Sequence, residues 1–368
     1  MERKILLTPG PATTSDSVKN AQVVPDICPR EKEFGEIMNS ISLDLVKIAG
    51  GDDNYTCILL GGSGTAGMDA TISSVINGKV LIINNGAYGQ RFVNIAKAYS
   101  FDFKEIFFNW NEEIDIKKVE AELEKDKDIK YLVVVHHETT TGILNPVKEI
   151  GEIAKKHNCT FIVDTISSFA GIPFNIKEWN IDFMISTSNK CIQGMPGVCF
   201  VICNKDKLEK IKDNPKKSFY LNLYTSYDSF RKTKQTPFTP PVQTLYALRK
   251  AIDEFLQEGA ENRYKRYMEN NKILIEGMEK LGFKKALKNL KESRLLTTFW
   301  EPEDKNYSFE KMHDLLYKKG FTIYPGKIRE KTFRVANIGE IYPQDMSIFI
   351  QSMKSILEEM NLKMALSK

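Results

Sequence analysis

Short apolar runs alternate with stretches of helical periodicity along the first two thirds of the chain. The runs contain few polar interruptions, which is typical of strands that are covered on both faces in a parallel sheet. The predicted strands are residues 57–60, 79–83, 131–135, 160–163, 183–186 and 198–202. Between them, apolar residues recur at helical spacing, as at Ile116, Val119 and Leu123. This order predicts an α/β domain with a mostly parallel sheet and right-handed crossovers.

The pattern changes after a long predicted helix at about residues 241–259, whose apolar face carries Leu245, Leu248, Ile252 and Phe255. Lysine-rich helical segments follow this helix. The later predicted elements are a strand at 295–299, a helix at 309–318 and a strand at 331–335. We therefore expect a large α/β domain over residues 21–259 and a smaller α+β domain over residues 260–368.

Composition and charge are those of an ordinary globular chain. The 368 residues are 42% hydrophobic and 27% charged, so the chain can bury a sizeable core. A net charge of +4 is too small to indicate binding to nucleic acid or to a membrane surface, and no transmembrane run of apolar residues is visible. The six cysteines and four histidines lack the spacing of metal or redox motifs. We expect no metal, nucleic-acid or membrane partner, and a reducing, cytoplasmic location.

A glycine-rich loop at residues 62–67 follows a predicted strand and precedes a predicted helix. Its letters match the dinucleotide-binding pattern, but Asn84 and Asn85 stand where that site needs an acidic residue. No Lys-Ser or Lys-Thr pair closes the loop as in a P-loop. Small residues at a helix N-terminus still let backbone N–H groups approach a phosphate. The loop is either a phosphate cradle or a tight turn without a ligand.

Asp164 ends one predicted strand, and Lys190 follows another. Because ligands gather at the strand ends of α/β sheets, this carboxylate and this amine could face one crevice. Each residue alone is as easily explained as a helix cap or a solvated side chain. Together with a phosphate loop they indicate pyridoxal 5'-phosphate, which needs a lysine for an imine, a carboxylate for its ring nitrogen and a phosphate cradle.

Longer segments resemble the class V (fold-type I) pyridoxal-phosphate aminotransferases, and the resemblance covers nearly the whole chain. The matching segments are residues 6–11, 26–34, 62–65, 85–91, 137–146, 164–169, 188–194, 238–241 and 333–340. Residues 138–146 and 189–194 are particular to the branch of the family that handles phosphonates. The resemblance implies a fold-type I transferase fold, with the N-terminal segment, residues 1–20, near the active site.

The resemblance also implies a role for individual residues. Lys190 would form the Schiff base, Asp164 would hold the pyridine nitrogen, and Tyr88 would stack on the ring. Arg334 would bind the acid group of the substrate, although it could instead pair with Glu340 as a structural residue. The other implied residues are Gly10 for the substrate, and Ser63, Gly64, Thr65, Thr139, Thr141, Ile166, Asn189, Thr236 and Thr239 for the cofactor.

The implied reaction moves the amino group of 2-aminoethylphosphonate to pyruvate, giving phosphonoacetaldehyde and alanine. The implied assembly is a homodimer in which Thr239, with Thr236, reaches the cofactor phosphate of the partner subunit. Three alternatives stay open: another class V transaminase of the alanine/serine–glyoxylate or serine–pyruvate type, a cysteine desulfurase, and a non-enzymatic dimer on a degenerate fold. Tyr88 argues against the desulfurase, which is expected to stack a histidine, and intact Lys190 and Asp164 argue against degeneration.

Overall fold

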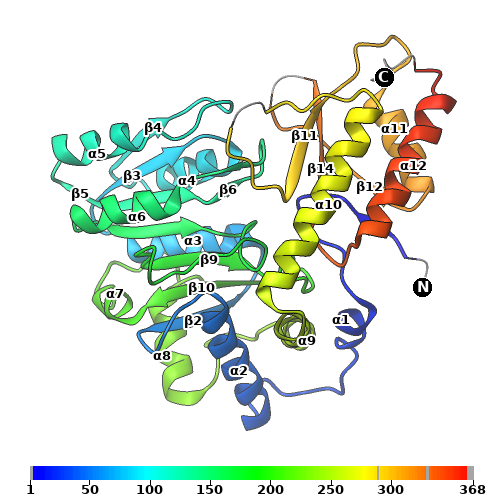
Figure 1. The fold of residues 1–368 in the computed structure, drawn as a ribbon. Helices are drawn as coiled ribbons and strands as arrows, with labels where there is room; N and C mark the ends of the chain where they lie inside the picture. Colours follow the sequence, from blue (N-terminus) through cyan, green and yellow to red (C-terminus); the bar gives the residue numbers. More distant parts are fainter. Residues whose placement is uncertain (1–2, 288–289, 329–330, 363–368) are drawn as a thin grey trace.

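A seven-stranded sheet is the centre of the larger part of the molecule (Figure 1). Its strands are β2 (Tyr55–Gly61), β3 (Lys79–Asn84), β4 (Phe103–Phe107), β5 (Ile129–Val135), β8 (Thr160–Asp164), β9 (Phe183–Thr187) and β10 (Val198–Asn204). This computed structural model describes residues 3–287, 290–328 and 331–362. The strands lie in the order β2-β10-β9-β8-β5-β3-β4, and every neighbouring pair that excludes β10 is parallel. All six predicted strands are present, whereas the edge strand β4 is only partly buried and its pattern does not predict it.

Strand β10 departs from the parallel pattern, because it runs antiparallel to both β2 and β9. Only residues 188–197 connect β9 to β10. A parallel connection needs a crossover of about a dozen residues or more, usually with a helix. Strand β10 is nevertheless almost fully buried. Its apolar run therefore predicts burial but does not indicate whether the strand runs parallel or antiparallel to its neighbours.

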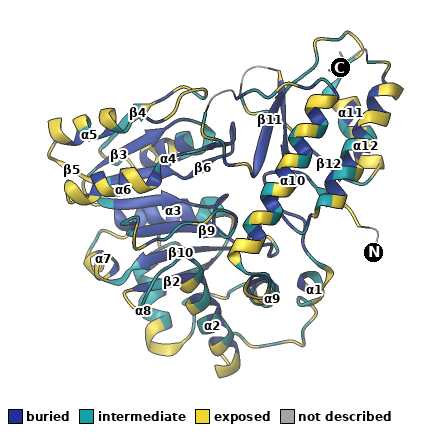
Figure 2. Ribbon diagram, in the orientation of Figure 1, coloured by how far each residue is buried: buried dark blue, intermediate teal, exposed yellow. Residues whose placement is uncertain are grey.

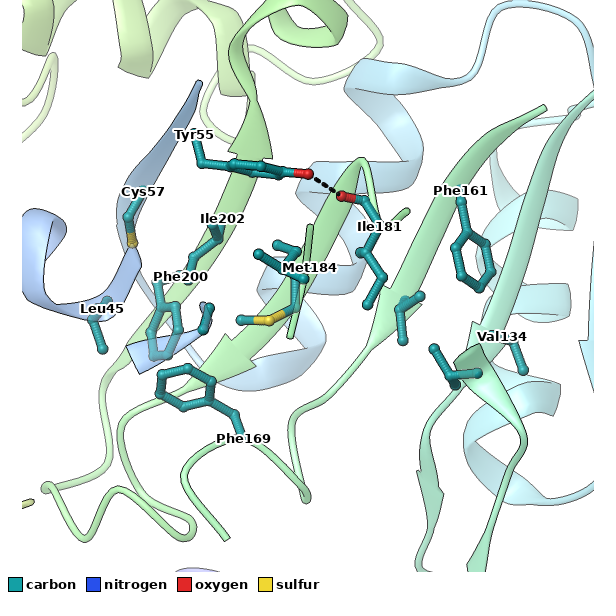
Figure 3. Packing of buried hydrophobic residues seen from close by; sticks show 14 of the residues in the cluster. Leu45, Tyr55, Cys57, Val134, Phe161, Phe169, Ile181, Met184, Phe200 and Ile202 are labelled. Atoms are coloured by element: carbon teal, nitrogen blue, oxygen red, sulfur yellow. Dashed lines mark hydrogen bonds between the residues drawn. The ribbon is translucent and has the colours of Figure 1, made fainter. Parts of the chain in front are cut away.

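Helices cover both faces of this sheet, and exposed residues lie on their outer sides (Figure 2). The helices that pack on one face are α2 (Lys32–Ile48), α5 (Ile116–Lys125), α6 (Val147–Lys156) and α9 (Val242–Glu258). Those on the other face are α3 (Gly64–Val75), α4 (Ala87–Ala98), α7 (Lys205–Lys210) and α8 (Leu223–Thr233). Figure 3 shows the first interface, where Leu45 of α2 lies near Phe200 of β10 and Phe169. This two-faced burial explains the uninterrupted apolar runs.

A second body follows helix α9 and has its own core. Its antiparallel sheet has the order β11 (Leu296–Trp300), β14 (Thr332–Ala336), β13 (Tyr324–Pro325). The helices of this body are α10 (Ala260–Lys280), α11 (Phe309–Lys318) and α12 (Pro343–Glu359). Phe299, Phe333 and Phe349 pack together in its core. Gly259, with φ +81°, separates α9 from α10, so the chain changes direction where the second body begins.

The N-terminal segment connects the two bodies. Strand β1 (Ile5–Leu6) pairs in parallel with β12 (Phe321–Thr322) of the smaller body. Helix α1 (Asp16–Asn20) instead packs through Val18 on helix α9 of the larger body. The chain between β1 and α1 therefore crosses from one body to the other. No described helix combines the length and apolarity needed to cross a membrane.

Candidate active site

Several of the residues singled out from the sequence lie where strands of the large sheet end, at one edge. Strands β8 and β9 are adjacent and parallel, so Asp164 at the end of β8 and Lys190, just after β9, emerge at the same edge. The loop after β2, the start of helix α4 after β3, and residues 138–141 after β5 also leave the sheet there. This common edge follows from parallel pairing, which aligns the carboxyl ends of the strands.

Lys190 lies against the crossing N-terminal segment. Its Nζ donates a hydrogen bond of 2.6 Å to the carbonyl oxygen of Pro9. Gly10 has φ +139°, and a Cβ at that position would overlap the Lys190 side chain. Burial lowers the pKa of Lys190, although Tyr88, Cys191 and Asp164 oppose the shift. A larger neutral fraction makes this amine a better nucleophile and proton acceptor.

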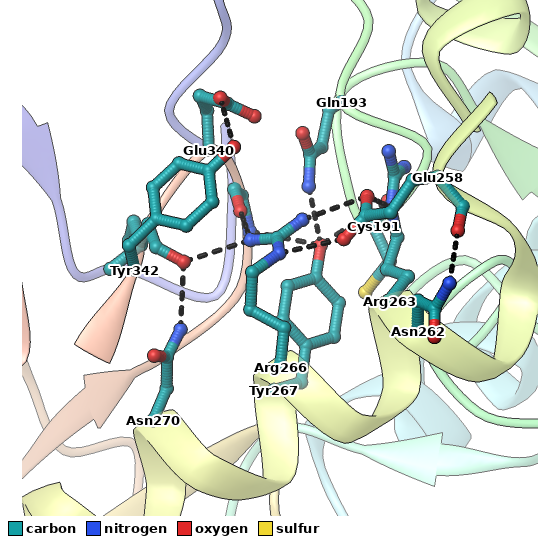
Figure 4. Close-up of polar contacts among 12 residues, drawn as sticks. Cys191, Gln193, Glu258, Asn262, Arg263, Arg266, Tyr267, Asn270, Glu340 and Tyr342 are labelled. Carbon is teal, nitrogen blue, oxygen red and sulfur yellow. Dashed lines mark hydrogen bonds and ion pairs between the residues drawn. The ribbon is translucent and has the colours of Figure 1, made fainter.

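A buried polar network holds the loop that carries Lys190 (Figure 4). Arg263 of helix α10 is 1% exposed and donates to the carbonyl oxygen of Cys191 over 3.1 Å. Gln193 donates from Nε2 to the hydroxyl of Tyr267, also on α10, over 2.7 Å. Arg263 is held in turn by Glu258 at 2.7 Å. The position of the lysine loop therefore depends on a helix of the smaller body.

Asp164 is a buried carboxyl whose charge is poorly compensated. It is 2% exposed, and its Oδ1 accepts a hydrogen bond of 2.7 Å from the backbone N–H of Ile166. Burial raises the pKa of Asp164 to about 7; Glu138 adds to the shift, whereas the Ile166 bond, Arg91 and Lys190 oppose it. A cationic ring nitrogen beside this carboxyl would favour its ionised form.

Tyr88 lies in the first turn of helix α4 among cationic side chains. The guanidinium carbon of Arg91 is 4.8 Å from the ring centroid, and Nζ of Lys327 is 4.6 Å from it. Burial raises the pKa of the Tyr88 hydroxyl, but the charges of Lys327 and Lys190 outweigh this and the net shift is downward. Arg91 also donates to Oγ1 of Thr65 over 2.9 Å. Arg91 thus joins the tyrosine to the glycine loop.

The glycine loop has the local features of an anion cradle. Ser63 is the N-cap of helix α3, yet its side chain makes no capping hydrogen bond. Gly64 begins the helix, and a Cβ there would be 2.7 Å from Cδ1 of Ile166, so the close approach of loop and strand end requires glycine. Exposed N–H groups at a helix start, with Arg91 beside them, favour a bound phosphate.

Arg334, on strand β14, is a buried cation without an acidic partner in the described part of the chain. Its Nε donates to the carbonyl oxygen of Pro325 at 3.0 Å, and its Nη1 donates to that of Thr139 at 2.9 Å. The alternative pairing with Glu340 is not found among the described residues: Arg334 donates to the two carbonyls, and Glu340 accepts from the hydroxyl of Tyr342. A guanidinium held by two carbonyls retains donors for an anionic ligand.

The threonines at 139 and 141 differ in their surroundings. Oγ1 of Thr139 is buried and interacts with the hydroxyl of Tyr88, but it makes no hydrogen bond of normal geometry with any described residue. A buried hydroxyl in this state is costly, and a ligand oxygen would satisfy it. Oγ1 of Thr141 instead accepts from the backbone of Ile143, and the Thr141 carbonyl accepts from Thr298. The geometry supports a ligand role for Thr139 and a turn-forming role for Thr141.

Glu138 is a residue that the sequence argument did not single out. Its fully buried carboxylate accepts from the backbone N–H groups of Tyr88 and Gly89, both at 3.2 Å, and from Thr140. These contacts place a carboxylate at the N-terminus of α4, where the helix dipole favours it. Glu138 therefore fixes the helix start that carries Tyr88. Its presence beside the threonines in residues 138–141 was the only sequence signal for this role.

Three residues that the resemblance assigns to the cofactor, Asn189, Thr236 and Thr239, have no side-chain hydrogen bond to Lys190 or Asp164 among the described residues. Oδ1 of Asn189 accepts from Thr187 at 3.1 Å, and the Asn189 carbonyl accepts from the backbone of Ala12. Oγ1 of Thr236 donates to the carbonyl oxygen of Phe238. Thr239 is exposed. Among the described residues, neither threonine forms a hydrogen bond with Lys190 or Asp164.

A group of potential metal ligands lies elsewhere on the surface. Donor atoms of Glu120, Glu124 and His157 lie within 4.8 Å of one another. The sequence argument assigned no metal ligands, partly because the histidines are badly spaced, and only the fold brings this histidine to the two acids. Lys156 already forms an ion pair with Glu120, so we do not assign a metal ion to this group.

Known proteins similar to this chain share one family. The aminotransferase class-V family model matches residues 16–327. A 2-aminoethylphosphonate–pyruvate transaminase of Phocaeicola vulgatus is 43% identical over 97% of this chain and 99% of its own length. A protein of the same name from Bacteroides fragilis is 39% identical over 95% of this chain and 98% of its own.

Solved structures agree with this assignment at the level of the fold. Ureidoglycine–glyoxylate aminotransferase of Bacillus subtilis superposes with a TM-score of 0.92 at 24% identity, covering 100% of this chain and 96% of its own. An alanine–glyoxylate aminotransferase of Nostoc superposes with a TM-score of 0.90 at 25% identity, covering 97% of this chain and 96% of its own. The expected fold-type I architecture is confirmed. The chain belongs to the class V aminotransferase family.

Proposed function

We propose that this aminotransferase uses pyridoxal 5'-phosphate to move the amino group of 2-aminoethylphosphonate to pyruvate, and that it does so as a cytoplasmic homodimer. The observation that carries the substrate assignment is the 43% identity, over nearly the full length of both chains, to a transaminase named for these substrates. The buried and acid-free guanidinium of Arg334 supports it, because both substrates present an anionic group.

The residues at the sheet edge fit this cofactor. The amine of Lys190, the buried carboxyl of Asp164 and the buried, weakly bonded hydroxyl of Thr139 match its aldehyde, ring nitrogen and ring oxygen. The start of helix α3, with Ser63, Gly64 and Thr65, suits its phosphate. When bound, the cofactor supplies an electron-withdrawing ring that stabilises negative charge on the carbon bearing the amino group.

The chain itself contributes proton transfer, orientation and binding. Lys190 can accept a proton as a neutral amine and return it, since its pKa is lowered by burial and its Nζ is oriented by Pro9. With the cofactor bound, Asp164 would present a buried negative charge to the protonated ring nitrogen, an electrostatic effect that is strong away from water. Arg334 binds the acid group of either substrate and so sets the distance from that group to the reacting carbon.

The visible spectrum of the purified holoenzyme tests the substrate assignment. Addition of 2-aminoethylphosphonate should convert the spectrum to that of the aminated cofactor, and pyruvate should reverse the change. Alanine should act as the amino donor in the reverse direction. If serine or glyoxylate reacts and 2-aminoethylphosphonate does not, the enzyme is a different class V transaminase, as its likeness to two glyoxylate aminotransferases would allow.

The structure weakens the cysteine desulfurase alternative. Such an enzyme needs an accessible thiolate. Five cysteines are buried, namely Cys57, Cys159, Cys191, Cys199 and Cys203, so burial argues against a reactive thiol at these five positions. Cys28, in the segment before helix α2, is exposed. Burial raises the pKa of Cys191 to about 12, so the thiol beside Lys190 stays protonated and inert.

Arg334→Lys is expected to weaken both half-reactions, by roughly 1.5–3 kcal/mol for each charged hydrogen bond lost. A lysine cannot reproduce the planar fork that is held by Pro325 and Thr139. Single-turnover absorbance with each substrate separately measures the effect, and thermal unfolding controls for lost packing. If only the half-reaction with pyruvate is weakened, the phosphonate is bound by residues other than Arg334. If neither half-reaction is weakened, Arg334 has a purely structural role.

The proposed dimer has composite sites, because Thr239 is exposed and does not bond to the candidate site of its own chain. A subunit with Lys190→Ala and a subunit with Thr239→Val should each be impaired as homodimers. In a hybrid dimer, one site would carry both changes and the other none, so activity should recover in part on mixing. Activity that stays absent in hybrids verified by mass, or an active monomer, would refute the composite site.

A further inference from the structure

We propose that Lys327 supplies a second positive charge beside Arg334 and thereby lets the site select a phosphonate over a carboxylate. The inference rests on the proposed function and deepens it, because it assigns substrate selection to a residue outside the sheet edge. It concerns the short hairpin formed by strands β13 and β14 of the smaller body.

The same hairpin carries Lys327 in its loop and Arg334 in its second strand. Tyr324 pairs with Arg334 across the hairpin, and the carbonyl of Pro325 accepts from the Arg334 guanidinium. The backbone N–H of Gly326 donates to the carbonyl of Thr332 at 2.7 Å, and a Cβ on Gly326 would overlap Thr332. This close contact fixes the point at which the chain passes from β13 into the hairpin loop, and Lys327 is the next residue of that loop.

The ammonium of Lys327 points to the candidate site. Its Nζ lies 3.3 Å from the hydroxyl oxygen of Tyr88, within donor distance, and 4.6 Å from the ring centroid. No carboxylate of a described residue lies within 4.0 Å of it. Both Lys190 and Lys327 lower the pKa of Tyr88, and Tyr88 interacts electrostatically with Arg334. Together with Arg91, which lies over the ring, four basic side chains surround this tyrosine.

The charge of the ligand explains why a second cation matters. A carboxylate carries one negative charge, which the free donors of Arg334 can match. A phosphonate resembles a phosphate group, which carries about −1.5 to −2 charges near neutral pH and has three acceptor oxygens. Its additional charge needs another donor, and Lys327 is a flexible point charge with three N–H donors. Its exposed position lets it engage a phosphonate without a large desolvation cost.

The test uses the holoenzyme with Lys327→Met and Lys327→Arg, and Lys319→Met as a matched control. Lys319 is an exposed lysine of the same body, with the same change in charge. We expect Lys327→Met to weaken apparent binding of 2-aminoethylphosphonate by roughly tenfold, as for the loss of one charged hydrogen bond, and binding of alanine by less than threefold. Arginine should largely restore binding, and Lys319→Met should change neither value.

A second readout does not require turnover. Ethylphosphonate and propionate carry the two acid groups without an amine, and calorimetry measures their binding to the holoenzyme. Lys327→Met should weaken ethylphosphonate selectively. Equal weakening of both ligands, or of neither, would overturn the proposal. If the wild-type enzyme does not react with 2-aminoethylphosphonate, the proposed function fails, and the ethylphosphonate comparison still decides whether Lys327 selects the higher charge.

Discussion

Replacing Lys190 with alanine is expected to reduce amino transfer by at least about 10⁴-fold, because one side chain performs two tasks. It is the amine at the sheet edge that can bond covalently to the cofactor, and it is also the group placed to move the proton. Among the described residues, its Nζ hydrogen-bonds to a backbone carbonyl and to no side chain, so its removal leaves no side chain without its hydrogen-bond partner. Single-turnover absorbance should show almost no reaction.

Borohydride reduction provides an independent measurement. In the wild-type holoenzyme, reduction should fix the cofactor to the peptide that contains Lys190, and mass spectrometry should show no such adduct in Lys190→Ala. Small primary amines added to this variant should restore part of the proton transfer. Lys97→Ala, an exposed lysine on the helix of Tyr88, is the control and should react normally. Near-normal turnover of Lys190→Ala would contradict the assignment.

Asp164→Asn is expected to slow the reaction by roughly 10²–10³-fold while the cofactor stays bound. Asparagine retains an acceptor for the N–H of Ile166, so the local backbone should persist. It cannot carry the buried negative charge that stabilises a protonated ring nitrogen. Stopped-flow kinetics and cofactor titration separate rate from binding. Unchanged kinetics would show that another group protonates the ring.

Stability of the cofactor-free protein tests the same carboxyl without turnover. The pKa of Asp164 is about 7 in the folded chain against 3.8 for an ordinary aspartate. Between these values only the folded state holds the proton, so its contribution to the free energy of unfolding should fall as pH rises. The difference in that free energy between wild type and Asp164→Asn should decrease by about 3 kcal/mol from pH 4 to pH 7. If the difference in the free energy of unfolding does not depend on pH, the pKa of Asp164 in the folded chain is that of an ordinary aspartate.

Much of the large domain follows from local pattern. Each apolar run became a strand, because residues buried on both faces of a sheet must all be apolar whatever their partners. Asp164 and Lys190 were placed at strand ends by their positions after such runs. The direction of β10 and the marginal strand β4 could not be read in this way, since apolar content carries no information on direction and β4 is only partly buried.

The sequence by itself determined most of the strand framework, the positions of two candidate site residues at its edge and, through motif resemblance, the family. The tertiary structure decided how these residues are supported. Glu138 meets Tyr88 from 50 positions along the chain, and Lys327 meets it from 239. Arg263 holds the carbonyl of Cys191 from 72 positions away. Such contacts depend on which elements pack together. The residue pattern within one helix or strand predicts only which face of that element is buried, not which element covers it.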